Sequence, residues 1–320
     1  MADIIALLLP FFGLIFIGYL AAKVTKQPAE ALGWMNTFII YAALPALFFK
    51  LVSRTPVEQL TRADFIFGEI AATYLVFLLL FLIGFFIRRN SFEDCTIQAF
   101  AGSYGNIGYM GPGLALLAFG EAAAVPVALI VCFENAAHFV VAPAMMAVAG
   151  EDRRPVVQVV LEIARKVILH PFIISTALGF CFAAFGFRPH DSVQRLIDYL
   201  AQAAAPCALF AMGVTLALRP IKRVPLEIGY IAVAKLILLP ITTYTVLSLI
   251  GNFEPVWIYS ATLLSALPTA TNVFVISQQY GIWQERASAS ILIITAASVL
   301  TLPVLLYLIH SGALPPDLVP

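Results

Sequence analysis

Apolar runs separated by short polar segments fill almost the whole chain of 320 residues. A helix needs about 20 predominantly apolar residues to cross the hydrocarbon core of a membrane, which is about 30 Å thick. The runs have this length, and no segment between them could hold a separate soluble domain. The pattern predicts an all-α integral membrane protein with ten transmembrane helices, at residues 4–22, 32–51, 64–87, 95–118, 125–148, 164–186, 195–217, 226–250, 256–280 and 287–310.

Two of these runs are interrupted by residues that break helices. Residues 101–113 read AGSYGNIGYMGPG, and about 160 positions later residues 265–272 read SALPTATN. Backbone groups freed by a break cannot bond to lipid, so a break is stable only where it faces protein or a watery cavity. Paired interruptions in the two halves of a chain point to the binding site of a transporter. We therefore expect the fourth and ninth helices to be broken and to carry the functional site.

Prolines recur at a nearly constant offset along the chain. Pro10 and Pro171 are 161 positions apart, and so are Pro45 and Pro206. The register predicts two five-helix repeats within one membrane domain. Because five is odd, the second repeat enters the membrane from the opposite side, which makes an inverted repeat. The predicted repeats are residues 1–150 and 151–320.

Basic residues are distributed unevenly between the two sides of this topology. The side rich in Lys and Arg is normally cytoplasmic. Twelve basic residues fall on one side and five on the other, which places both termini outside the cytoplasm. The twelve are Lys23, Lys26, Arg88, Arg89, Arg153, Arg154, Arg165, Lys166, Arg219, Lys222, Arg223 and Arg286, and the five are Lys50, Arg54, Arg62, Arg188 and Arg195. The start of the chain lacks the positive region of a secretory signal, so we expect the first span to be retained.

The composition excludes several classes of function. The chain is 62% hydrophobic and 11% charged, with a mean hydropathy of +0.96, whereas a soluble domain carries about 25% charged residues. Its net charge of zero gives no indication of a nucleic-acid partner. No P-loop or dinucleotide fingerprint is present. We expect no cofactor, no metal site and no enzymatic activity; the cysteines, which form no CxxC motif, are Cys95, Cys132, Cys181 and Cys207.

Several stretches resemble the auxin efflux carrier family, which includes plant auxin carriers and bacterial malonate and malate permeases. The resemblance covers nearly the whole chain, and its most specific motifs are GNIGYMGPGLALLAFG at 105–120 and LPTATNVFVISQQYG at 267–281. It implies a ten-span fold with inverted repeats, whose broken helices four and nine cross at the middle of the bilayer. It further implies a scaffold of helices 1, 2, 6 and 7, a mobile transport unit of helices 3–5 and 8–10, and a homodimer formed through the scaffold. The short loop between helices five and six favours a bacterial carrier.

The two breaks supply the predicted substrate site. Their polar side chains, Asn106 and Asn272, could bond either to a substrate or to the freed backbone, because Asn is also a common helix cap. The glycines allow a close backbone approach. Pro112 and Pro268 remove backbone donors, and a half-helix that starts beside a break turns its positive end toward an anion. The predicted substrate-binding residues are Gly105, Asn106, Ile107, Pro268, Thr269, Asn272 and Lys235.

Lys235 lies about ten residues into the eighth span, which is about 15 Å deep by helix rise. A charged side chain at that depth costs at least about 2.5–3.5 kcal/mol unless it is paired, so it should face the interior. It could balance the charge of a bound anion, or it could be paired permanently with helix C-terminal dipoles. The sequence leaves both interpretations open.

Two further side chains could carry protons, and another acidic side chain lies in the third span. Glu134 lies mid-span, and His138 follows one turn later on the same helical face. The pair predicts an ion-coupling site; the other interpretation of His138, and the more common one for such a histidine, is a satisfied interior side chain. Glu69 lies only about 8 Å from the outer end of the third span by helix rise, so we expect it at a hydrated rim.

These features together predict a secondary transporter. Its substrate would be a small organic anion, such as malonate or malate, moved across a bacterial inner membrane by elevator-like alternating access and possible coupling to protons. One alternative is a passive or sodium-coupled carrier of an auxin-like or other weak acid. Another, from a different class, is an intramembrane sensor or enzyme, although no paired catalytic residues are recognisable.

Overall fold

The computed structural model describes residues 2–150, 158, 161, 164–165, 168–218, 225–316 and 318, and these residues are helical with short connections. The α-helices are α1 (Ala2–Thr25), α2 (Gly33–Phe38), α3 (Leu44–Ser53), α4 (Val57–Leu60), α5 (Ala63–Leu82), α6 (Phe92–Ser103), α7 (Gly111–Phe119), α8 (Ala124–Val148), α10 (Pro171–Phe185), α11 (Asp191–Leu218), α12 (Glu227–Val233), α13 (Leu239–Ile250), α14 (Pro255–Ser265), α15 (Asn272–Tyr280) and α16 (Gln284–His310). Single 3-10 turns are η1 (Ala29–Leu32) and η4 (Gly120–Ala123), and π-turns are η2 (Ile39–Ala43), η3 (Ile83–Ile87) and η5 (Ala234–Leu238).

Several helical stretches are long and apolar enough to cross a membrane. Within the described residues there are six of these, and two shorter apolar helices at Leu9–Thr25 and Ile173–Phe185. The all-helical character predicted from the sequence is confirmed for this part of the chain. The six stretches are Glu30–Ser53, Val57–Ile87, Gly111–Val148, Asp191–Leu218, Glu227–Ile250 and Gln284–His310.

The chain divides into two compact units, each made of segments that are distant in sequence. Unit 1 comprises Met1–Arg62, Gly108–Cys132 and Ile168–Pro220, and unit 2 comprises Ala63–Ile107, Phe133–Val167 and Ile221–Pro320. This division follows spatial contacts, whereas the predicted repeats follow sequence order, so the repeat boundary near residue 150 stays a prediction. Unit 1 contains the helices expected to form a scaffold, together with α7 and the first part of α8.

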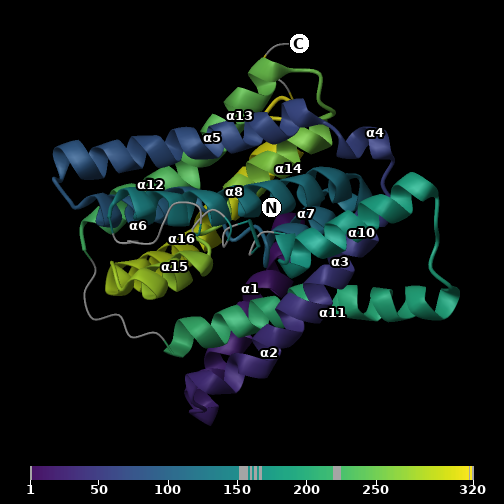
Figure 1. Ribbon diagram of the computed structural model, residues 1–320, viewed down its shortest axis with the longest axis horizontal. Helices are drawn as coiled ribbons and strands as arrows, with labels where there is room; N and C mark the ends of the chain where they lie inside the picture. The colour runs from purple at the N-terminus through teal and green to yellow at the C-terminus, as the bar shows by residue number, and fades with distance from the viewer. Residues whose placement is uncertain are drawn as a thin grey trace. The chain divides into compact units, whose positions relative to one another are not determined.

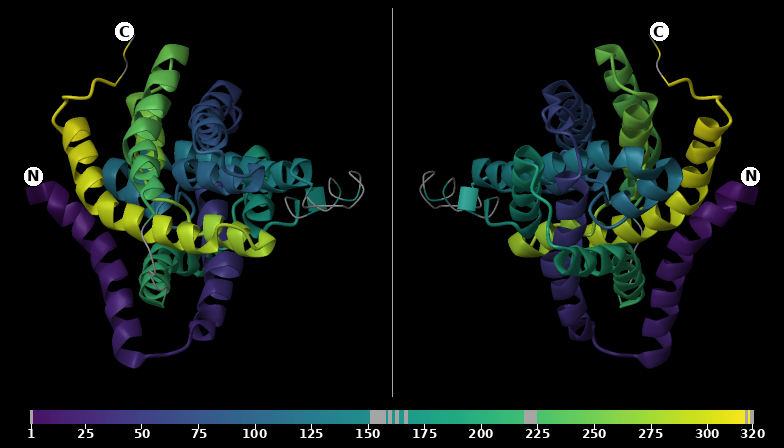
Figure 2. Two further views of the ribbon diagram at one scale, coloured as in Figure 1. Left: turned by 90° about the vertical axis from the view of Figure 1, so that its left-hand side faces the viewer. Right: turned by 90° about the vertical axis from the view of Figure 1, so that its right-hand side faces the viewer.

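Unit 1 is built from closely packed helices. Figure 2 shows α1 turning back through a short loop into the segment that leads to α3. Helix α11 packs along α1 and against α3, and α10 packs on α3 (Figure 1). A Cβ atom at Gly213 of α11 would overlap the carbonyl oxygen of Ile15, and one at Gly18 of α1 would overlap that of Phe210. The missing side chains therefore let the backbones of α1 and α11 touch, as small residues do between membrane helices.

A second glycine contact in unit 1 repeats this arrangement. A Cβ atom at Gly179 of α10 would lie 3.2 Å from the carbonyl oxygen of Phe49 on α3. Gly18 and Gly179 are 161 positions apart, and so are Phe49 and Phe210. The contact of Gly18 with Phe210 and that of Gly179 with Phe49 are thus related by the offset that relates the prolines.

Unit 2 holds a large apolar core. Helix α5 packs on α6 and α13, α13 packs on α14, and α16 contacts α12, η5 and α15. Phe77 of α5 and Phe100 of α6 meet edge to face, with ring centroids 4.8 Å apart. Both rings belong to the core cluster, which also includes Tyr104, Leu239 and Ile294. The cluster also includes Ala101 in the last turn of α6 and Val273 in the first turn of α15, the two helix ends beside the predicted site.

The two interruptions expected from the sequence are present. Helix α6 ends at Ser103, Tyr104 is extended, and helix begins again at Gly111. Helix α14 ends at Ser265, and α15 begins at Asn272. Pro112 lies in the first turn of α7, where its missing N–H group removes no helix hydrogen bond.

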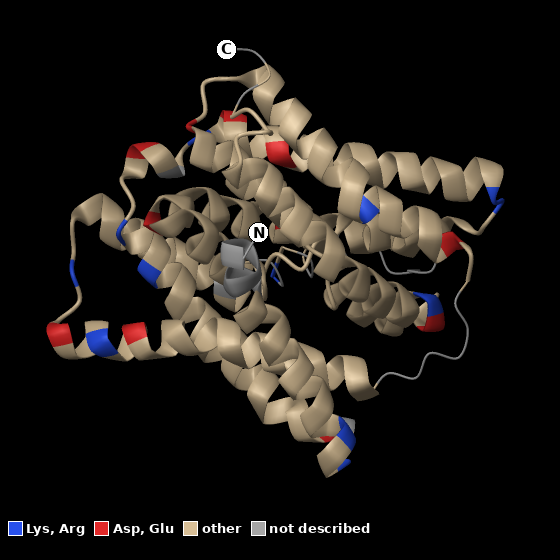
Figure 3. Cartoon of the chain, turned by 180° about the vertical axis from the view of Figure 1, so that it is seen from behind, with Lys and Arg blue, Asp and Glu red and all other residues tan. Residues whose placement is uncertain are grey.

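Charged side chains concentrate near helix ends and connections, and the helix bodies are almost free of them (Figure 3). This is the distribution of a chain whose helices face lipid. Several of the basic residues that determined the predicted orientation lie outside the described residues. These are Arg153, Arg154, Lys166, Arg219, Lys222 and Arg223.

Because α1 and α11 touch at Gly213, we expect alanine to destabilise the protein at Gly213 but not at Gly13. Gly213→Ala should push the helices apart and lower the free energy of unfolding by about 1–3 kcal/mol, as overpacking does. Gly13→Ala is the matched control, because a Cβ atom at Gly13 meets nothing within 4 Å. Thermal unfolding of both variants in detergent measures the effect, and equal midpoints would contradict the close contact.

Candidate functional site

The two breaks pair with each other inside unit 2. Gly105 and Thr269 form an antiparallel bridge. The backbone N–H of Asn106 donates to the carbonyl of Pro268 at 2.8 Å, and that of Ala270 donates to the carbonyl of Tyr104 at 2.9 Å. Four backbone groups freed by the breaks are thus satisfied by each other, as the absence of water in hydrocarbon requires.

Side chains satisfy further carbonyls at the helix ends. The last four carbonyls of a helix have no partner within it. The hydroxyl of Thr269 donates to the carbonyl of Ala101, in the last turn of α6, at 2.6 Å. The hydroxyl of Ser265 donates to the carbonyl of Thr262, in the last turn of α14, at 2.9 Å, and the same carbonyl also accepts from the backbone N–H of Ala266. Thr269, predicted from the sequence as a substrate ligand, therefore also ties the two breaks together.

Lys235 reaches the same place from the π-turn η5. Its side chain is fully buried, and its ammonium group donates to the carbonyl of Ser265, the last residue of α14. A Cβ atom at Gly105 would lie 3.4 Å from the Lys235 nitrogen and 3.2 Å from the carbonyl oxygen of Leu264, so the ammonium group lies close beside this part of the first break. The C-terminal end of a helix carries partial negative charge, which favours a cation there. The contact with a helix C-terminus, one of the two interpretations open from the sequence, is present.

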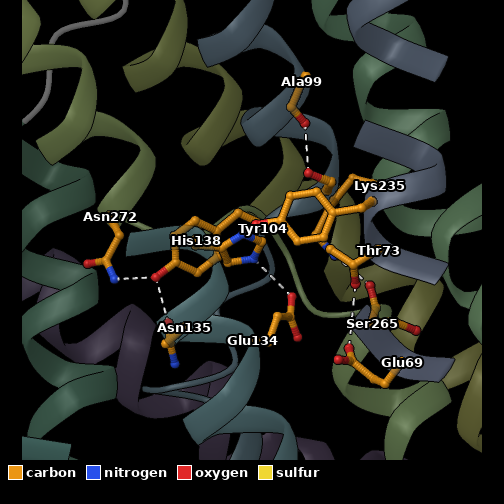
Figure 4. Close-up of polar contacts among 12 residues, drawn as sticks. Glu69, Thr73, Ala99, Tyr104, Glu134, Asn135, His138, Lys235, Ser265 and Asn272 are labelled. Carbon is orange, nitrogen blue, oxygen red and sulfur yellow. Dashed lines mark hydrogen bonds and ion pairs between the residues drawn. The ribbon is translucent and has the colours of Figure 1, made fainter. Parts of the chain in front are cut away.

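A tyrosine connects the second break to α8. The side-chain amide of Asn272 donates to the Tyr104 hydroxyl at 2.7 Å, and that hydroxyl donates to the Asn135 side chain at 2.6 Å (Figure 4). Tyr104 and Asn135 are 1% and 4% exposed. The amide of Asn272 thus contacts a neighbouring break, and the N-cap of α15 is Thr271, which has no side-chain cap bond. Asn106, which is also buried, contributes its backbone N–H to the pairing.

Glu134 and His138 meet as their spacing predicts. The Nε2 atom of His138 lies 3.1 Å from a Glu134 carboxyl oxygen, and its Nδ1 atom lies 3.0 Å from the Tyr74 hydroxyl. The imidazole is enclosed by aromatic rings, with its centroid 4.0 Å from that of Tyr104 and 5.5 Å from that of Phe100. Both nitrogen atoms of this histidine are therefore occupied.

The prediction that Glu69 lies at a hydrated rim is wrong. Glu69 is 3% exposed, and its carboxyl group accepts from the Thr73 hydroxyl at 3.5 Å. Distance along α5 alone does not determine the exposure of this side chain, because other segments pack around the helix. Phe65, one turn before Glu69, stacks edge to face on Phe253 and Trp257, which cover this end of the helix.

All the predicted site residues belong to unit 2, and the structure adds others that the sequence did not single out. Ile107 is buried and lies in the middle of the first break, between the end of α6 at Ser103 and the start of α7 at Gly111. Tyr74, Tyr104 and Asn135 were missed. Each of them places a polar atom in the middle of an apolar run. A buried polar atom needs a hydrogen-bond partner, and this could have indicated that these residues belong to a polar network.

Comparison with known proteins identifies the family. A family model described as "Membrane transport protein" matches residues 3–306. The chain belongs to this family. The resemblance to auxin efflux carriers is thereby confirmed, and the chain is a multi-pass membrane transporter rather than an enzyme.

One relative of this transporter aligns over its full length. It is a protein of Rhizobium meliloti (strain 1021) that bears the name "Putative malonate transporter", and it is 67% identical over 320 residues, which is 100% of both chains. Within the described part of this transporter, no group of three or more His, Cys, Asp or Glu side chains could hold a metal ion.

The Tyr104 hydroxyl should contribute measurably to the stability of this transporter. Tyr104→Phe keeps the ring but removes a partner of two amide side chains, which should lower the free energy of unfolding by about 1–3 kcal/mol. Tyr307→Phe, at a side chain of α16 that is 44% exposed, is the control and should be neutral. If both variants unfold at the same temperature in detergent, the chain from Asn272 to Asn135 is not a stabilising contact.

Proposed function

We propose that this transporter carries a small dicarboxylate, with malonate the first candidate, across the inner membrane of a bacterium. The observation that carries the proposal is the buried ammonium group of Lys235 at the point where the two breaks meet. The name of its relative supports the choice of malonate. Gly105, Asn106, Ile107, Pro268, Thr269 and Asn272 surround or form the paired breaks and are the proposed substrate-binding residues.

A carboxylate suits this place for two electrostatic reasons. An ammonium group has three N–H donors, and the contact with Ser265 uses one of them. Helix α15 begins at Asn272, beside the second break, and the positive end of its dipole favours an anion. Interactions of this kind gain strength where water is excluded.

The proposed movement follows from the same arrangement. We propose that unit 2, which contains the whole candidate site, moves as the transport unit while unit 1 serves as the scaffold, so that the site is exposed to each side in turn. The glycine contacts related by 161 positions support the further proposal of ten spans in two inverted five-helix repeats. A homodimer through unit 1 belongs to the same proposal.

Exchange across liposomes tests the function directly. Purified protein is placed in liposomes loaded with unlabelled malonate, and entry of labelled malonate is followed without any ion gradient. We expect rapid entry of labelled malonate, and we expect unlabelled malonate or malate added outside to inhibit it. If none of malonate, malate, succinate or indole-3-acetate exchanges, the proposal is wrong; preference for indole-3-acetate would favour the weak-acid alternative, and accumulation driven by sodium alone would favour sodium coupling.

Variants of Lys235 connect this exchange to the site. Lys235→Ala should weaken malonate binding by about 2–5 kcal/mol, the cost of losing a buried charged partner, which is more than tenfold in Kd. Lys235→Arg keeps the charge but places a larger planar group beside Gly105, so it should not restore binding. Lys23→Ala, at an exposed residue of α1, is the control. Undiminished malonate binding by the Lys235→Ala variant would remove this ammonium from the site.

The proposed orientation has a separate test. With both termini outside the cytoplasm, a reporter fused after Pro320 should be accessible to an impermeant reagent added to the periplasmic side. Access from the cytoplasm alone would reverse the orientation. Light scattering of the purified protein in detergent measures its oligomeric mass, and a monomeric mass would contradict the homodimer.

A further inference from the structure

A chain of three polar side chains leads from the second break into the interior of unit 2. The nitrogen of the Asn272 amide donates to the Tyr104 hydroxyl at 2.7 Å, and that hydroxyl donates to the side-chain oxygen of Asn135 at 2.6 Å (Figure 4). Tyr104 and Asn135 are buried, whereas Asn272 is partly exposed. Asn272 is therefore the end of the chain that a ligand can reach.

The direction of these hydrogen bonds fixes the orientation of the Asn272 amide. A tyrosine hydroxyl carries a single hydrogen, and here that hydrogen is bound to Asn135. The hydroxyl oxygen can then only accept, so the amide turns its nitrogen toward Tyr104 and its oxygen away (Figure 4). An amide nitrogen has two N–H groups, and Asn272 makes no other side-chain hydrogen bond within the described residues. Its outer edge thus offers one acceptor and one donor.

Packing holds the Tyr104 ring in the same place. Its centroid lies 4.0 Å from that of His138 and 6.4 Å from that of Phe100. The imidazole of His138 is itself held at both nitrogens, by Glu134 at 3.1 Å and by Tyr74 at 3.0 Å. The Tyr104 hydroxyl is therefore fixed through its ring as well as through its hydrogen bonds, which preorganises the amide that it holds.

A protonated carboxyl group complements the outer edge of this amide. Its hydroxyl donates and its carbonyl oxygen accepts, whereas an ionised carboxylate only accepts. A carboxylate opposite the Asn272 oxygen would bring two acceptors together, and both would lose water without gaining a hydrogen bond. The edge of Asn272 therefore favours the neutral form of a carboxyl group over the ionised form.

The charge of the site favours the same form of the substrate. Lys235, at the paired breaks, is the one buried Lys or Arg side chain in the part of the chain that the structure describes. Its positive charge balances one carboxylate. A second ionised carboxylate would find no further buried cation among these residues, and burying an unpaired charge is costly. The site thus matches a ligand with one negative charge.

We propose that the transporter carries malonate as its monoanion, whose protonated carboxyl group meets Asn272 and whose charge Lys235 balances, and that Tyr104 and Asn135 are positioning residues for this selection. The inference rests on the proposed transport of malonate and names the ionic form of the substrate. Each malonate then brings one proton on its own carboxyl group and releases that proton to the solution on the other side. This coupling needs no proton on a side chain of the protein.

Malonamate separates the two ionic forms, because an uncharged amide replaces one of its carboxyl groups. Calorimetry measures the binding of both ligands to the unmodified protein at several pH values above the pKa of the second carboxyl group of malonate. The Kd of malonate should rise by about tenfold per pH unit, because the fraction of monoanion falls in that proportion. The Kd of malonamate should stay constant. A malonate Kd that does not rise, or failure of malonamate to bind, would overturn the inference.

Titration of the protein gives a different result in the same experiment. The partly buried Tyr74 and the buried side chains of unit 2 that can titrate would change the binding of malonate and malonamate alike. A parallel rise of both Kd values would therefore place the titrating group in the protein and would overturn the inference. Among the described residues these buried side chains are Glu69, Cys95, Tyr104, Glu134, His138, Glu227, Lys235 and Tyr244.

Variants test the two positioning residues. Tyr104→Phe and Asn135→Leu both release the Asn272 amide, which can then turn its nitrogen outward and donate to an ionised carboxylate. The rise of the malonate Kd with pH should therefore be reduced in both variants, although neither side chain meets the ligand. A purely structural role would lower stability without changing this dependence, and Tyr307→Phe, at an exposed side chain of α16, should retain it in full.

The outcomes distinguish the inference from the function on which it rests. Full pH dependence in both variants would refute the positioning role of Tyr104 and Asn135. The comparison of malonate with malonamate needs no variant to fold. Malonate exchange in liposomes together with a malonate Kd that is independent of pH would refute the monoanion and leave the proposed function standing. Absence of both malonate binding and malonate exchange would refute the proposed substrate and the inference with it.

Discussion

The backbone pairing between the two broken helices is the constraint on which the rest of unit 2 depends. An interrupted helix exposes N–H and C=O groups that lipid cannot satisfy. Backbone hydrogen bonds from Asn106 to Pro268 and from Ala270 to Tyr104 satisfy groups that each break leaves without a helical partner. Neither interruption would be stable alone, so the two must fold together. The centre of the site is thus held by backbone hydrogen bonds, although it consists of chain segments without regular structure.

The side chains around the pairing serve stability and chemistry together. Thr269 and Lys235 both bind carbonyl groups at the ends of helices that stop at the breaks. In the proposed function the same ammonium group also meets the anionic substrate. One side chain would then both support the break and bind the substrate, so that occupancy of the site alters the contacts that hold the break.

The sequence predicted the breaks, the buried lysine and the meeting of Glu134 with His138 because each depends on local information. The break at 101–113 combines several glycines with a proline, which together weaken a helix locally, whereas the single prolines Pro10 and Pro206 lie inside α1 and α11. Residues four apart share a helical face. The partners of these groups could not be predicted in the same way. Asn272 and Tyr104 are 168 positions apart. Glu69 was misplaced because depth along its own helix gives no information on the segments that pack around that helix, such as the rings of Phe253 and Trp257 on Phe65 one turn earlier.

The π-turn η5 determines the direction in which Lys235 projects from its helix. A π-turn contains one residue more than regular α-helix would use, and each residue of an α-helix turns the chain by about 100°. Deleting a single residue between Ala234 and Leu238 would restore regular helix and rotate one half of the span against the other. The direction of the ammonium group therefore depends on the number of residues in this turn. An insertion or deletion in η5 would alter the site even if every side chain around it were preserved.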